Sequence, residues 1–271
     1  MTFAATPRSR SEDRRISPVF WVLLATLGTS AWAVYSGYGN ARFGVFLFVV
    51  SGWMVSLCLH EYAHARTALH GGDITVGAKG YLTLNPLKYT NVLLSFVLPI
   101  VFVILGGIGL PGGSVWIERS RIQGRLKHSL ISAAGPLVNV VFAAALLIPV
   151  GAGWLDDSDL HASYYGYELP VSPFACALGF LGLLQLSAAL LNLLPVPGLD
   201  GYGIIEPWLS AKARRSVEPF APYGMLAVFA LLWQPEVNSF FFGIVHDLMS
   251  LFGVDTDYAT VGRYLFSFWK S

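Results

Sequence analysis

Two histidines and a glutamate in the first third of the chain have the spacing of a metal site. His60 and His64 are four residues apart, so on a helix their side chains share one face and can bind a single ion. Glu61 adjoins the first histidine, cannot easily bind the same ion, and points toward the position of an attacking water. This is the H-E-x-x-H pattern, in which two imidazoles hold zinc and the carboxylate is the general base. The alternative is a group of interfacial side chains without a metal.

A catalytic zinc usually has three protein ligands, so a third ligand must come from elsewhere in the chain. The segment 192–201, NLLPVPGLDG, offers Asp200 shortly after two prolines. Pro195 and Pro197 remove backbone donors and force an extended course, which lets Asp200 leave helical register and face the ion. A Pro-x-Pro segment followed by Asp-Gly is by itself usually only a turn. Its expected place at the cytoplasmic end of a span, level with the two histidines, favours the ligand interpretation.

A third motif occupies residues 133–139, AAGPLVN. The small residues at its start allow another helix to approach closely, and Asn139 places an amide inside an apolar segment, where it needs a partner. Asn139 could hydrogen-bond the substrate backbone or the tetrahedral oxyanion, or it could tie two helices together. The residues alone leave both interpretations open.

The elements that must position these side chains are membrane helices. Of 271 residues, 55% are apolar and 12% are charged, against about 25% charged residues in soluble domains. The mean hydropathy is +0.59, so we expect one polytopic domain for which the lipid bilayer is the main apolar environment. A net charge of +1 without a basic tract excludes a nucleic-acid-binding surface. The two cysteines lack CxxC spacing and indicate neither a disulfide framework nor a cysteine zinc site.

Uncharged runs predict where the chain crosses the membrane. The run 16–41 follows fifteen residues that contain four arginines, which indicates that the N-terminal tail, residues 1–17, is cytoplasmic. The run 43–59 then returns inward and leads into the two histidines. The run 129–155 should go outward and the run 169–199 inward again, because the loop between them carries acidic residues and no Lys or Arg.

Four other segments have less regular patterns. Residues 71–87 are rich in Thr, Val, Ile and Gly and predict a short membrane-associated β-hairpin that could hold an extended substrate by edge pairing. Basic residues on both flanks of the Gly- and Pro-rich segment 89–117 favour re-entry over a single crossing. The apolar segments 220–233 and 240–254 predict either a final hairpin or one crossing and an interfacial helix. Residues 255–271 are expected to form a C-terminal tail.

In this order, HEYAH at 60–64, AGPLVN at 134–139 and NLLPVPGLDG at 192–201 resemble the site-2 protease family of intramembrane zinc metalloproteases. The match extends over roughly residues 43–215 and is closest to the compact bacterial type without a PDZ domain. The resemblance implies one zinc ion per chain with three ligands: His60, His64 and Asp200. It implies Glu61 as the catalytic residue, with Asn139 and Asn192 contacting the substrate or the oxyanion.

Together, the pattern of runs and the resemblance predict an all-α polytopic membrane domain over residues 18–254. It has about six transmembrane helices with a three-helix catalytic core, the β-hairpin and the re-entrant segment. The implied function is hydrolysis of peptide bonds in or near transmembrane segments of single-span proteins, close to the cytoplasmic face of a bacterial cell membrane. The main alternative is an inactive zinc-binding scaffold for single-span proteins. A permease ranks below it because no inverted repeat is visible, and the sequence does not indicate an oligomeric state.

Overall fold

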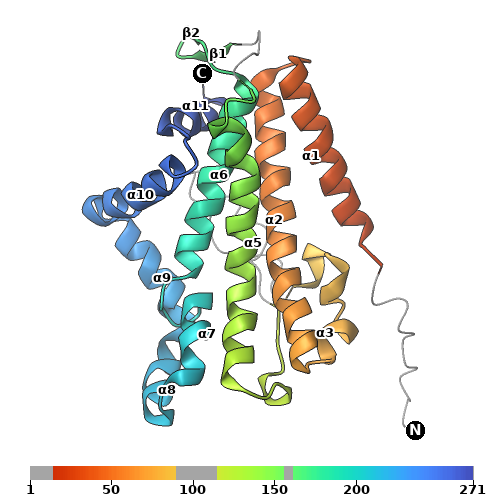
Figure 1. Ribbon diagram of the computed structural model, residues 1–271, viewed down its shortest axis with the longest axis vertical. Coiled ribbons are helices and arrows are strands. Elements are labelled where there is room, and N and C mark those ends of the chain that lie inside the picture. Colours follow the sequence, from red (N-terminus) through yellow and green to blue (C-terminus); the bar gives the residue numbers. More distant parts are fainter. Residues whose placement is uncertain (1–14, 90–114, 156–160, 271) are drawn as a thin grey trace.

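The computed structural model describes residues 15–89, 115–155 and 161–270. Four long helices lie side by side in it (Figure 1): α1 Pro18–Ser36, α2 Ala41–Gly71, α5 Arg125–Gly151 and α6 Pro173–Asn192. Each is long and apolar enough to cross a membrane, so the four predicted runs are confirmed as candidate spans. Within the described residues the number of candidate spans is four, or up to five if a bent helix pair counts as one. The count of six stays a prediction.

Capping residues in the local sequence determine where these helices begin and end. Ser17 and Ser172 each accept a hydrogen bond from a backbone N–H two residues ahead, and a proline follows each serine at the first helical position of α1 or α6. Asn40 caps α2 in the same way, through a hydrogen bond from the Phe43 N–H. Gly37 ends α1 in the left-handed conformation, with φ of 68°. A short capped turn therefore reverses the chain between α1 and α2.

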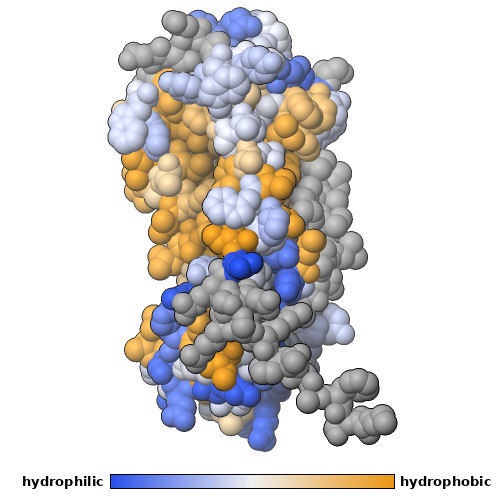
Figure 2. Space-filling view, turned by 90° about the vertical axis from the view of Figure 1, so that its right-hand side faces the viewer, coloured by the Kyte–Doolittle hydropathy of each residue, from blue (hydrophilic) through white to orange (hydrophobic). Residues whose placement is uncertain are grey.

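The first two motifs lie on α2 and α5, and the third begins at the end of α6 and continues just beyond it. In α6, 89% of the most apolar stretch is buried, against 67% in α2, 39% in α5 and 17% in α1. Because lipid is as apolar as leucine, the outer faces of α1 and α5 can remain apolar without a protein partner. Figure 2 shows apolar residues over much of the middle of one face and polar residues mainly toward its ends. This distribution suits a chain that crosses a bilayer.

The β-hairpin predicted within residues 71–87 is wrong. The segment forms the short helix α3 Thr75–Ala78 and two 3-10 turns, Tyr81–Thr83 and Pro86–Lys88. Leu84, with φ of 55°, is in the left-handed region and cannot continue an extended strand. In the described part of the chain the one hairpin is β1 Ala162–Tyr164 paired antiparallel with β2 Tyr167–Leu169, in the loop between α5 and α6.

The C-terminal part is more structured than a tail. The stretch Ala211–Leu232, which ends in α9 Ala221–Leu232, meets α10 Pro235–Ser250 at a bend of 95°. This bend does not decide between the two predicted alternatives. Helix α11 Thr256–Phe266 occupies the segment expected to be a tail and packs on α6. A Cβ at Gly262 would lie 2.1 Å from the Cys176 backbone oxygen, so the two helices are in close contact. The predicted re-entrant segment 89–117 lies almost entirely outside the described residues.

Candidate metal centre

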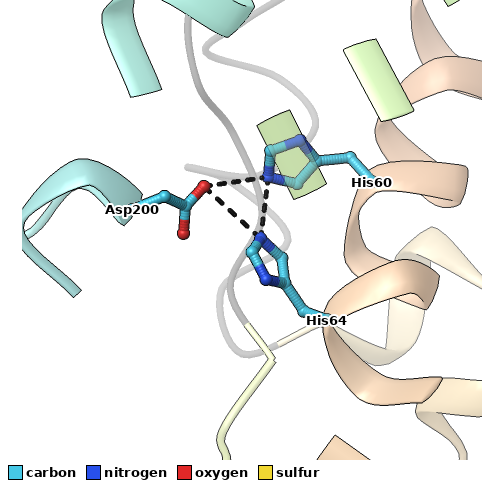
Figure 3. Close-up of side chains that lie close together, drawn as sticks. All are labelled: His60, His64 and Asp200. Atoms are coloured by element: carbon cyan, nitrogen blue, oxygen red, sulfur yellow. Dashed lines mark hydrogen bonds and ion pairs between the residues drawn. The ribbon is translucent and has the colours of Figure 1, made fainter. Parts of the chain in front are cut away.

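The structure brings together the three predicted ligands from two distant parts of the chain (Figure 3). His60 and His64 lie on the inner face of α2, and Asp200 is the first residue of α7 Asp200–Ile205. Asp200 Oδ2 lies 3.3 Å from His60 Nε2 and 3.4 Å from His64 Nε2. The two Nε2 atoms are 3.0 Å apart. All three side chains therefore point their donor atoms at one shared space.

This arrangement fits a zinc ion by donor chemistry and by space. Two imidazole nitrogens and one carboxylate oxygen are zinc ligands, and three protein ligands leave a fourth position for water or substrate. Their ligand atoms all lie within 4.8 Å of one another. A Cβ at Gly135 of α5 would lie 2.2 Å from His64 Nε2 and 2.4 Å from His60 Nε2. The glycine of the second motif therefore keeps the space in front of both nitrogens free of side-chain atoms.

The backbone between α6 and α7 places Asp200 next to the histidines. After α6 ends, Pro195 and Pro197 interrupt helix formation, and Leu199 is extended, with φ of −108° and ψ of 161°, directly before α7 begins. A Cβ at Gly201 would lie 2.2 Å from the Leu193 backbone oxygen. The chain can thus fold back onto the end of α6 only with glycine next to Asp200, which explains the Asp-Gly pair in physical terms.

Each imidazole is also held through its second ring nitrogen. His64 Nδ1 lies 2.7 Å from the Ile131 backbone oxygen, and His60 Nδ1 lies 2.6 Å from Asn139 Oδ1. Such contacts orient metal-binding imidazoles and select the ring nitrogen that faces the metal. Asn139 also donates to Gln185 of α6, so its amide connects α2, α5 and α6. This is the interhelical tie, one of the two interpretations that the sequence left open. A substrate contact of Asn139 stays a prediction.

Glu61 lies beside the three ligands without joining them. Its side chain is buried, and its Oε2 accepts a hydrogen bond of 3.0 Å from the Val115 backbone N–H. Glu61, the three ligands and Asn192 at the end of α6 line one cavity of about 1170 Å³. This volume exceeds the roughly 300–1,000 Å³ of common small-molecule pockets and leaves room for an extended peptide. A role of Asn192 toward substrate stays a prediction.

A buried carboxylate that no sequence motif indicated holds the backbone near Glu61. Asp73 is 0% exposed; it accepts hydrogen bonds from the Thr75 N–H and hydroxyl, 2.9 and 2.6 Å long, and from the Glu118 N–H, 2.7 Å long. Burial raises the pKa of Asp73, but these hydrogen bonds outweigh it, and the pKa is below its ordinary value. Asp73 thereby fixes residues 115–118, whose first N–H contacts Glu61.

Sequence reasoning also missed Gln185, although a signal was present. Gln185 and Asn192 are seven residues apart, two turns along one face of an otherwise apolar span. Polar side chains inside a span usually mark a functional face. Searching each predicted span for polar residues at helical spacing would have found Gln185.

Candidate membrane-spanning helices that enclose a His-His-Asp donor group beside a glutamate define the class of membrane zinc metalloproteases. Comparison with known proteins gives the family. The chain is 41% identical to Rip2 of Mycolicibacterium smegmatis, over 97% of this chain and 98% of that protein. It is 40% identical to Rip2 of Mycobacterium tuberculosis, over 96% of each chain. YwhC of Bacillus subtilis is 31% identical over 71% of this chain and 83% of its own length.

All three relatives are named as candidate zinc metalloproteases. The chain belongs to the site-2 protease family of zinc metalloproteases. No family model matches the chain, and no solved structure matches it.

Proposed function

We propose that this protein is an intramembrane zinc endopeptidase that hydrolyses peptide bonds in or near transmembrane segments of single-span membrane proteins. The observation that carries the proposal is the meeting of His60, His64 and Asp200 beside a buried Glu61 in one large cavity. A metal site used only for structure is usually closed by four protein ligands. The group of three found among the described residues therefore supports a catalytic site.

The chemistry is divided between the metal and Glu61. His60, His64 and Asp200 would hold one zinc ion, which supplies a Lewis acid that polarises the scissile carbonyl and acidifies water. Glu61 takes the proton of the attacking water and passes it to the leaving amine. The Val115 N–H hydrogen-bonds Glu61 Oε2 and orients the carboxylate. The other oxygen, Oε1, then serves the proton transfer.

The charge distribution supports cleavage near the cytoplasmic face. Helix α7, which begins with Asp200, and the basic helix α8 Ala211–Val217 lie at the same end of the molecule as the basic start of α5 (Figure 1). The β1–β2 hairpin lies at the opposite end. Because cytoplasmic loops carry an excess of Lys and Arg, the basic end of the molecule, near the ligands, belongs inside, and with it the N-terminal tail.

A substrate helix must be extended before it can be cut, because its carbonyls are engaged in hydrogen bonds within the helix. The substrate cannot be held extended by pairing with a strand at 73–86, because the described residues there form helical turns. The open volume beside Glu61 is the feature that can accept an extended segment.

Replacing Glu61 by Gln tests the proposal and separates it from a zinc-binding scaffold. The E61Q variant should keep about one zinc per chain and lose cleavage of single-span proteins by about 10²–10⁴-fold, the usual contribution of a general base. Purified wild type and variant are compared for zinc content and for cleavage of a panel of single-span proteins in proteoliposomes. Zinc binding without cleavage by the wild type would favour the scaffold, and turnover by E61Q would remove Glu61 as the base.

A further inference from the structure

A chain of hydrogen bonds runs from His60 across all three inner helices and back to α2. Asn139 of α5 donates from Nδ2 to Gln185 Oε1 of α6, over 2.8 Å. Gln185 donates from Nε2 to Ser56 Oγ of α2, over 2.8 Å. The Ser56 hydroxyl lies 3.0 Å from the Trp53 backbone oxygen. The three linking side chains are buried, with exposures of 3% for Asn139, 0% for Gln185 and 1% for Ser56.

The direction of every bond in this chain follows from its last member. A backbone carbonyl can only accept, so the Ser56 hydroxyl donates to Trp53, and Ser56 Oγ is left to accept from Gln185. The amide of Gln185 must then present its NH₂ group to Ser56 and its oxygen to Asn139. The amide of Asn139 is oriented in the same sense, with its oxygen toward His60 Nδ1.

This order determines which ring nitrogen of His60 carries the proton. An amide oxygen cannot donate, so His60 Nδ1 is the protonated nitrogen and Nε2 keeps its lone pair. Nε2 is the atom that faces Asp200 and His64. His64 also carries its proton on Nδ1, because that nitrogen faces the Ile131 backbone oxygen, which can only accept. His60 depends on two side-chain amides, and a side-chain amide can rotate by half a turn.

We propose that Gln185 is a positioning residue that fixes the Asn139 amide and thereby keeps the His60 lone pair on the metal-facing nitrogen. The inference rests on the proposed zinc site. Without Gln185, Asn139 can turn its NH₂ group toward His60 Nδ1. The proton then moves to His60 Nε2, and this nitrogen can no longer bind a metal ion.

The first test replaces Gln185 by Leu, which is close in size and has no hydrogen-bonding group. Loss of a partner that orients a metal-binding histidine typically costs 10–100-fold in metal affinity, and we expect the zinc dissociation constant of Q185L to rise by about this factor. The constant is measured by chelator competition on the purified full chain without substrate. Thermal unfolding of the zinc-free protein is measured in parallel.

Ser187→Ala is the matched control. Ser187 lies two residues away on the same helix and is also 0% exposed, but its hydroxyl donates to the Leu183 backbone oxygen within α6, over 2.8 Å. The S187A variant should bind zinc like the wild type. If Q185L does not fold, Ser56→Ala removes the next link with a smaller change in volume and should raise the zinc dissociation constant in the same direction.

An Asn139→Asp background separates amide orientation from packing. A carboxylate presents an acceptor to His60 Nδ1 whichever way it is turned, so residue 185 no longer controls the proton. We expect Q185L to raise the zinc dissociation constant at least tenfold when Asn139 is intact. In the N139D background, where the orienting effect is absent, the rise should be less than about threefold.

Equal losses in both backgrounds, or no loss in either, would overturn the role of Gln185 while the zinc site stands. A wild-type chain that does not bind zinc would instead overturn the proposed function, and the inference with it.

Discussion

Gly135→Ala tests whether the free space in front of His60 and His64 is the metal position. The added Cβ would lie 2.2 Å from His64 Nε2, which is 0.8 Å short of the 3.0 Å that real Cβ contacts respect. Metal–ligand distances in functional sites vary by only about 0.2 Å, so relief of this contact must move at least one imidazole out of coordinating range. We expect zinc affinity to fall by more than about 100-fold, beyond the usual cost of losing an orienting partner.

The folded state should survive this change. Alanine favours a helix by about 1 kcal/mol over glycine, which offsets part of the 1–3 kcal/mol that overpacking commonly costs. The assay is zinc content after chelator dialysis, together with thermal unfolding in detergent. Gly28→Ala in α1 is the control, because nothing lies within 4 Å of its added Cβ. A G135A protein that holds one zinc per chain with wild-type affinity would refute this placement of the metal.

Two further predictions concern the supports of the site. The pKa of Asp73 is lowered in the folded chain, so its carboxylate should stabilise the fold above the ordinary pKa of about 4, and this effect should disappear as the pH falls through the lower pKa of the folded chain. Asp73→Asn should therefore reduce the free energy of unfolding by about 1–3 kcal/mol near neutral pH. It should also flatten the acid limb of a plot of unfolding temperature against pH. Gly262→Ala should lower the unfolding temperature, because its added Cβ would lie 2.1 Å from the Cys176 backbone oxygen. Gly243→Ala is the control, since nothing lies within 4 Å of its added Cβ, and it should leave the unfolding temperature unchanged. Equal unfolding temperatures for the two variants would show that α11 does not pack on α6 as described.

The metal ligands were predictable because their pattern is local or follows from topology. His60 and His64 need only one helix to meet. Asp200 needed, in addition, the expectation that its segment and the histidines lie at the same membrane depth. Gln185 itself could have been found from its helical spacing with Asn192, but its partners could not, because they depend on which faces of α5 and α6 meet.

The wrong hairpin and the unexpected helix have different physical causes. Residues 71–87 have the composition of a strand, but hydrogen bonds from Thr75 to Asp73 start a helical turn there and outweigh that preference. The segment 255–271, which contains Arg263 and Lys270, was expected to be a short tail. Its buried residues Ala259, Gly262 and Phe266 recur at helical spacing, so periodicity would have predicted α11 where composition did not.

The most direct measurement is the zinc content of the purified wild-type chain beside that of an Asp200→Ala variant. Asp200 is the one ligand that joins α7 to the histidines of α2. We expect about one zinc per wild-type chain and a large loss in D200A, because two histidines alone do not make a catalytic zinc site. Equal zinc content in both proteins, or none in the wild type, would contradict the three-ligand centre.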